Sequence, residues 1–145
     1  MNSHEEIEKG LELKFDFKKM RSIFKKIAEN NDVVPVVVQD VDSKDVLIVA
    51  YVNEEALIKT LELGKATFWS TSRNELWTKG LTSGNTLNIV EIRVNCEQNS
   101  FLFLVEIVNE GACHVKGPDG KPFKGCYYRK LDLKNPKKLS WVKEP

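Results

Sequence analysis

The chain has 145 residues, of which 41% are hydrophobic and 30% charged, and its formal net charge is +1. These values are typical of one soluble globular domain with a single core. The near-zero net charge excludes a global field that would recruit nucleic acid or anionic lipid, and no apolar run is long enough to span a bilayer. The acidic N-terminus lacks the apolar segment of a signal peptide, and the cysteines show no paired spacing. We therefore expect a cytoplasmic protein.

The N-terminal part predicts a leader followed by a helix. Residues 1–15 are polar, and we assign them to a leader that precedes a single domain at 16–145. Apolar residues recur at steps of three and four between positions 16 and 30, which is the spacing of an amphipathic helix. Asp16 is the expected N-cap of this helix.

Two strands and a second helix come next. Valine-rich residues 33–39 and residues 46–51 predict a hairpin around a polar turn. Asn53 is placed to cap the following helix, and Gly64 to end it. The predicted apolar face of that helix consists of Leu57, Ile58 and Leu61.

The remaining chain predicts mainly strands. Extended segments are expected at residues 66–70, 76–78, 86–95, 100–108 and 123–129. Residues 101–105 are apolar on both faces, so their strand should be central in the sheet. The basic stretch 130–138 is interpreted as a solvated tail. The fold class is α+β, a mainly antiparallel sheet with about two helices.

The three cysteines are Cys96, Cys113 and Cys126. Three thiolates would leave one tetrahedral position of a zinc ion open for water, as in catalytic zinc sites. A zinc-bound water ionises near neutral pH and can attack an electrophilic carbon. An odd number of cysteines without a C-x-x-C pair is, by spacing alone, a weak metal signature, and free cysteines are also common core residues.

Four segments carry a resemblance to a known family, and their order and spacing match throughout. They are residues 35–40, 50–57, 64–73 and 76–85. Through them the chain resembles the phosphoribosyl-AMP cyclohydrolases of histidine biosynthesis, over residues from about 34 to 129. The resemblance implies hydrolysis of the N1–C6 bond in the adenine ring of 1-(5-phosphoribosyl)-AMP. It also implies zinc dependence, magnesium assistance and a homodimer with its site at the subunit interface.

The resemblance assigns roles to particular residues. The zinc cysteines of the family map onto Cys96, Cys113 and Cys126. His114, beside a zinc ligand, is either the proton shuttle or a group that orients the ligand. Phosphate, ribose and purine contacts are expected from Arg73, Trp77, Lys79, Thr82, Ser83, Gly84 and Asn85. From the residues alone, Arg73 and Lys79 would more often be solvated surface charges, and an aromatic residue on a strand, such as Trp77, is more often part of the core.

The chain departs from the family where magnesium is held. The family's Asp-Cys-Asp-x-Asp run is here built from Asn95, Cys96, Glu97 and Asn99, so three carboxylates have become one. Magnesium is a hard cation that prefers carboxylate oxygens, and we therefore predict a weak or absent magnesium site. The connector 115–125 is also longer than in the family and is expected to reshape the mouth of the pocket.

Three hypotheses follow. The first is a working cyclohydrolase that needs less magnesium or uses it differently. The second is a diverged zinc hydrolase that acts on another purine or nitrogen heterocycle. The third is a zinc-stabilised binding protein without catalysis. In each case the expected ligand is a small nucleotide-like molecule, and no nucleic acid or membrane is involved.

Overall fold

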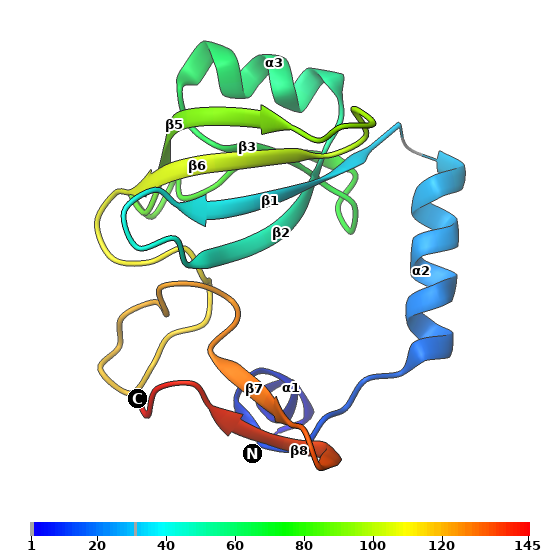
Figure 1. Ribbon diagram of the computed structural model, residues 1–145, viewed down its shortest axis with the longest axis vertical. Helices are drawn as coiled ribbons and strands as arrows, with labels where there is room; N and C mark the ends of the chain where they lie inside the picture. Colours follow the sequence, from blue (N-terminus) through cyan, green and yellow to red (C-terminus); the bar gives the residue numbers. More distant parts are fainter. Residues whose placement is uncertain (1, 31) are drawn as a thin grey trace.

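A computed structural model describes residues 2–30 and 32–145. The protein contains a four-stranded sheet in the order β2-β1-β6-β5 (Figure 1). The strands are β1 (Val34–Asp40), β2 (Val46–Val52), β5 (Leu87–Val94) and β6 (Phe101–Ile107). The predicted β1–β2 hairpin is antiparallel, as is β5–β6, whereas β1 and β6 run parallel. The sheet is therefore mixed but mainly antiparallel, and β6 holds the central position expected from its apolar sequence.

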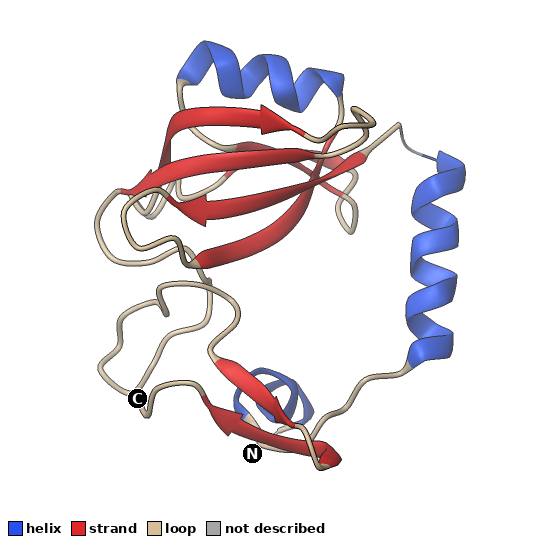
Figure 2. Cartoon of the chain, viewed as in Figure 1, coloured by secondary structure: helices blue, strands red, loops and turns tan. Residues whose placement is uncertain are grey.

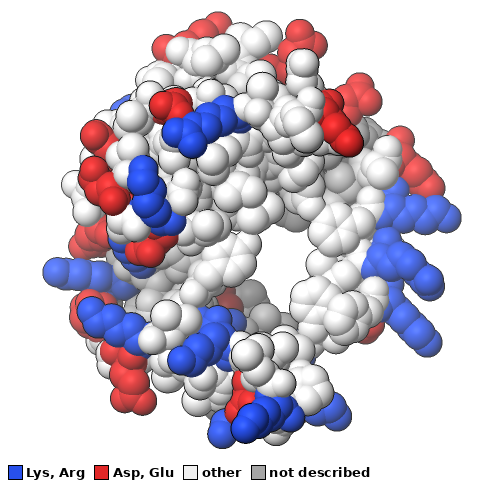
Figure 3. Space-filling model, in the orientation of Figure 1, with Lys and Arg blue, Asp and Glu red and all other residues white. Residues whose placement is uncertain are grey.

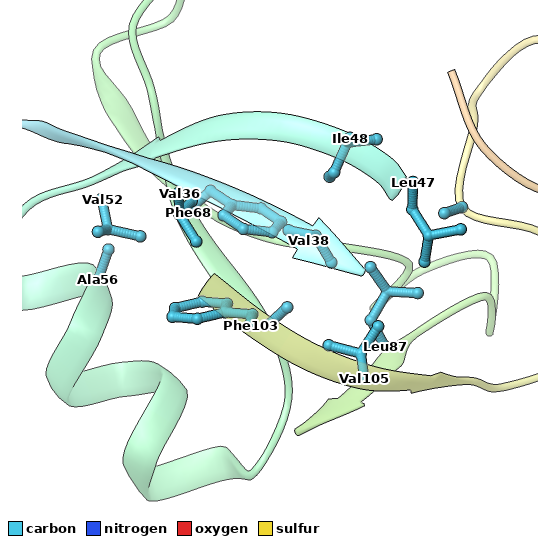
Figure 4. Close-up of a cluster of buried hydrophobic side chains, with 12 residues drawn as sticks. Val36, Val38, Leu47, Ile48, Val52, Ala56, Phe68, Leu87, Phe103 and Val105 are labelled. Carbon is cyan, nitrogen blue, oxygen red and sulfur yellow. The ribbon is translucent and has the colours of Figure 1, made fainter. Parts of the chain in front are cut away.

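The core lies between the sheet, α3 (Glu54–Leu63) and the hairpin of β3 (Thr67–Ser70) and β4 (Glu75–Thr78). Val36 and Val38 alternate with less buried residues along β1 and are fully buried. Phe68 of β3 stacks on Phe103 of β6, with ring centroids 6.3 Å apart (Figure 4). Burying each such side chain contributes roughly 1.5–3 kcal/mol to stability. The β3–β4 hairpin is thus anchored to the sheet by its aromatic residues.

Helix α3 has the predicted ends but not the predicted apolar face. The Asn53 side chain accepts a hydrogen bond from the Ala56 N–H at 2.8 Å, and Gly64 is the C-cap. The residues that α3 buries are Ala56 and Thr60, whereas Leu61 is 65% exposed. The small side chains allow close packing, and the Thr60 hydroxyl accepts a hydrogen bond from the N–H of Thr67 in β3. The assignment of Leu61 and Ile58 to the buried face was therefore wrong, and only Leu57 of the predicted set packs partly against the core.

The leader and the basic C-terminal stretch fold together. The leader contains a helix that the sequence did not predict, α1 (Ser3–Lys9), so the described chain has three helices (Figure 2). The stretch expected to be a solvated tail instead forms the hairpin of β7 (Arg129–Asp132) and β8 (Asn135–Trp141). Leader residues Leu11 and Leu13 exchange backbone hydrogen bonds with β8. Residues 123–128, expected to be a strand, are irregular.

Helix α2 (Phe17–Asn30) begins where predicted, because the Asp16 carboxylate accepts hydrogen bonds from the backbone N–H groups of Lys18 and Lys19. It connects the leader to β1 at one side of the sheet (Figure 1). Lys and Arg side chains project from its outer side (Figure 3). Phe24 meets Tyr51 of β2 edge-on at 6.2 Å, but remains 48% exposed. Among the described helices, none has the length and apolar character required to cross a membrane.

Candidate active site

Cys113 and Cys126 are brought together by the chain that folds back between them. The N–H of Ala112 donates to the Lys124 carbonyl at 2.9 Å, and that of Cys113 to the Phe123 carbonyl at 3.1 Å. Gly111 makes this approach possible, because a Cβ at that position would lie 2.4 Å from the Phe123 oxygen. The connector 115–125 therefore forms a loop that brings Cys126 back to Cys113.

The two thiols interact with each other, and this interaction separates their acidities. Hydrogen bonding with Cys126, helped by the N–H of Val115, lowers the pKa of the buried Cys113 thiol to about 6. The same bond raises the pKa of Cys126 above its usual value. One thiolate is thus available near neutral pH, and thiolates are the form in which cysteine binds metals.

Lys79, one of the cations that sequence analysis assigned to the substrate, interacts electrostatically with this cysteine pair. It follows β4 and is only 7% exposed. Burial lowers the pKa of its ammonium group, while the adjacent Cys113 and Cys126 act in the opposite direction. Few lysines are buried to this extent without a paired negative group. The position of Lys79 fits an anionic partner at the cysteine pair.

The loop that carries Thr82, Ser83, Gly84 and Asn85 is attached to the segment leading to Cys113. Its first residue, Gly80, has φ +74 and packs so closely on Asn85 that a Cβ would lie 2.0 Å from the Asn85 oxygen. The Asn109 side-chain amide donates to the Gly84 carbonyl at 2.6 Å. The N–H of Glu110 donates to the Asn85 side chain at 3.3 Å. The sequence analysis did not predict that Asn109 and Glu110 hold this loop in place.

Arg73 and Trp77 are placed differently. Arg73 lies at the β3–β4 turn, its side chain 65% exposed and 3.7 Å from Glu75. The hairpin register puts this turn at the opposite end from Lys79, so one chain does not bring the two cations together. Trp77 packs on Phe68 with ring centroids 5.7 Å apart and borders the core. Substrate contacts of both residues remain predictions.

Cys96 is separated from the other two cysteines. It is exposed in the β5–β6 turn, before β6 begins, whereas Cys113 follows the end of β6. The length of β6 puts roughly 20 Å between them. Within residues 2–30 and 32–145, no three His, Cys, Asp or Glu side chains are grouped as metal ligands.

Asn95, Glu97 and Asn99, the positions predicted to hold magnesium weakly or not at all, are hydrogen-bonded to one another. The side-chain oxygen Oδ1 of Asn95 accepts hydrogen bonds from the backbone N–H groups of Asn99 and Ser100, each at 2.9 Å. The Asn95 amide donates to the Asn99 side chain at 2.6 Å, and Asn99 donates to Glu97 at 3.4 Å. These side chains therefore close the turn that presents Cys96.

His114 is exposed, and its Nε2 lies 2.9 Å from the carboxylate of Glu8 in α1.

A cavity of about 720 Å³ lies between residues 117–125, the start of β2 and the C-terminal residues. Residues of the connector 115–125 line this cavity, whereas none of the three cysteines does, so its role at the mouth of a substrate pocket stays a prediction.

Comparison with known proteins identifies the family. A family model described as phosphoribosyl-AMP cyclohydrolase matches residues 48–128. A phosphoribosyl-AMP cyclohydrolase of Methanosarcina mazei is 47% identical over 109 residues, which cover 75% of this chain and 85% of the relative. That of Methanosarcina acetivorans is 48% identical over 101 residues, covering 70% and 78%. That of Archaeoglobus fulgidus is 44% identical over 104 residues, covering 72% and 90%. The chain belongs to the phosphoribosyl-AMP cyclohydrolase family.

Proposed function

We propose that this protein is a hydrolase of histidine biosynthesis that opens the N1–C6 bond in the adenine ring of 1-(5-phosphoribosyl)-AMP. The observation that carries the proposal is the Cys113–Cys126 pair beside the buried Lys79, in a chain of this family. The pair offers soft ligands for a metal, and the lysine offers a charge for a phosphorylated substrate.

The residues present fit zinc. Cys113 and Cys126 supply two thiols, one of them ionised near neutral pH because its pKa is lowered to about 6. Cys96 would supply the third, leaving one tetrahedral position for water. When bound, the metal would provide a hydroxide at neutral pH for attack on C6 of the purine.

The third ligand is proposed to come from a second copy of the chain. Cys96 and Cys113 lie at opposite ends of β6, roughly 20 Å apart, so Cys96 of the same chain does not reach the pair. A homodimer with the site at its interface would bring the partner's Cys96 to Cys113 and Cys126. The apolar side chains of Phe17 and Phe24 on α2, 76% and 48% exposed, give a second copy surface to cover.

In this site the remaining residues bind the substrate and move a proton. His114 carries the proton between the attacking water and the purine ring, since a neutral imidazole has one nitrogen that donates a proton and one that accepts it. Lys79 and the loop of Thr82, Ser83, Gly84 and Asn85 bind phosphate and ribose. Arg73 and Trp77 would act from the partner's side or at the outer end of the substrate.

Magnesium is proposed to have a smaller role than in the family. Asn95 and Asn99 bring amide oxygens without charge, and both are used to close the β5–β6 turn. This difference also favours a second candidate, a zinc hydrolase for a nitrogen heterocycle with fewer phosphates, since magnesium commonly neutralises phosphate groups.

Absorbance-monitored turnover of 1-(5-phosphoribosyl)-AMP by the zinc-loaded protein tests the proposal, because ring opening changes the purine spectrum. We expect turnover that changes little on adding magnesium. His114→Ala should lower kcat by roughly 100-fold or more, and Lys79→Gln should mainly raise KM. Stoichiometric zinc with no turnover would instead favour the second candidate or a binding protein, which a panel of purine analogues would separate.

A further inference from the structure

Glu8 is a carboxylate from the N-terminal leader that reaches the candidate active site. Its Oε2 lies 2.9 Å from Nε2 of His114, although the two residues are 106 positions apart. The Glu8 side chain is 20% exposed, whereas the histidine ring is 80% exposed. The partly buried carboxylate thus meets one edge of the ring and leaves the other edge open.

Contacts that do not involve the carboxylate hold Glu8 in this position. The hydroxyl of Tyr128 donates to the Glu8 carbonyl at 2.7 Å, and Arg129 donates to the Gly10 carbonyl at 2.8 Å. Backbone hydrogen bonds between Leu11, Leu13 and β8 continue the attachment. Helix α1 is therefore fixed to the segment that follows Cys126, and the backbone of Glu8 has a defined position.

The chemistry of the pair selects one form of the imidazole. An ionised carboxylate only accepts hydrogen bonds, so the nitrogen facing Glu8 must carry the proton. With Nε2 protonated, the lone pair of neutral His114 is on Nδ1, the nitrogen free to take a proton from another group. His4, on the same helix, lies 3.6 Å from the other carboxylate oxygen and is 79% exposed.

We propose that Glu8 is a positioning residue that holds His114 as the Nε2-protonated tautomer, so that Nδ1 is the nitrogen that exchanges a proton with the substrate. The role rests on the proposed function, in which His114 moves the proton. Glu8 lies outside residues 48–128, where the family model matches, so this chain's own leader supplies the group. Carboxylates that orient an active-site imidazole in this way are a recurring arrangement.

The kinetic test uses the full-length, zinc-loaded protein and its variants Glu8→Ala and Glu8→Gln. For Glu8→Ala we expect kcat to fall roughly 10- to 100-fold, with KM within about threefold. Glu8→Gln keeps an acceptor oxygen and should restore part of this loss. Glu6→Ala is the matched control, because Glu6 is an exposed residue of the same helix and should keep wild-type kcat. In a His114→Ala background, Glu8→Ala should have no further effect on kcat.

A spectroscopic test does not depend on turnover. The protein contains two histidines, so nitrogen-15 NMR of the imidazoles, with His4→Ala to assign them, reports the tautomer of His114 directly. We expect the Nε2-protonated form in the wild type and a mixture in Glu8→Ala. If the wild type turns over no substrate but shows this change, the proposed function fails while the positioning role stands. Three results would overturn the role: an unchanged imidazole spectrum, an equal fall of kcat in the His114→Ala background, or loss of zinc from Glu8→Gln, which would make Glu8 a metal ligand.

Discussion

Asn95 and Asn99 are joined by a side-chain hydrogen bond of 2.6 Å across the β5–β6 turn. The side-chain oxygen of Asn95 also accepts hydrogen bonds from two backbone N–H groups of the turn, so this residue stabilises the conformation of the turn. An aspartate could accept the same backbone hydrogen bonds but could not donate to Asn99. The turn thus keeps its shape with amides at positions where the family has carboxylates.

Restoring the carboxylates should restore magnesium binding. The combined variant Asn95→Asp, Glu97→Asp, Asn99→Asp should bind magnesium roughly tenfold or more tightly than the wild type, because charged oxygens replace neutral ones. Isothermal titration calorimetry measures the change. Asn74→Asp, which adds a carboxylate at the β3–β4 turn, is the control. Equal affinities in the wild type and the combined variant would mean that this turn is not arranged for magnesium.

Zinc should depend on cysteines from two chains. Cys126→Ser and Cys96→Ser should each lose zinc, and Cys126→Ser should also melt at a lower temperature, since metal binding contributes to the folded state. Mixed in equal amounts and re-assembled, the two inactive variants should recover about a quarter of wild-type activity, because half of the dimers contain one intact site. Metal analysis and turnover provide the readouts. Stoichiometric zinc in Cys126→Ser, or no recovery on mixing, would contradict the shared site.

The buried hydroxyl of Thr60 should matter more for stability than the larger side chain of Leu61. Thr60→Val leaves the Thr67 N–H without its partner at 3.0 Å, and the unsatisfied group should cost about 1–3 kcal/mol of unfolding free energy. Leu61→Ala, at a position 65% exposed, should change stability by no more than about 0.5 kcal/mol. Urea unfolding compares the two variants. The reverse order would mean that α3 packs through the face predicted from its sequence.

Asp40 should make stability depend on acid pH. Burial opposes its ionisation, but hydrogen bonds from Ser43 and Lys124 prevail, and its pKa is lowered from 3.8. A carboxyl whose folded pKa is depressed contributes stability above its unfolded pKa, and this is lost as pH falls through the folded value. The difference in unfolding free energy between the wild type and Asp40→Asn should therefore be constant near neutral pH and shrink below about pH 4. A difference that grows on acidification would refute this account.

The sequence determined the features that depend on neighbouring residues. Asp16 and Asn53 begin helices, and Gly64 ends one, because capping is decided by the residue at the helix end. The β1–β2 hairpin and the central place of β6 follow from apolar patterns in short segments. Family motifs in the sequence also identified Cys113, His114 and Lys79 as residues of interest.

Tertiary structure decided what depends on distant parts of the chain. β1 and β6 pair in parallel although they are far apart in the sequence, and the apolar pattern of each strand does not show which strand it pairs with. The C-terminal hairpin is exposed and charged, and backbone hydrogen bonds hold it to the leader. Because these bonds do not depend on the side chains, the residue types could not predict them. In the sequence, nothing distinguishes Glu8 from the other acidic residues of the polar leader. It became a candidate for the active site only because folding placed it 2.9 Å from His114, a long-range contact that local periodicity does not encode.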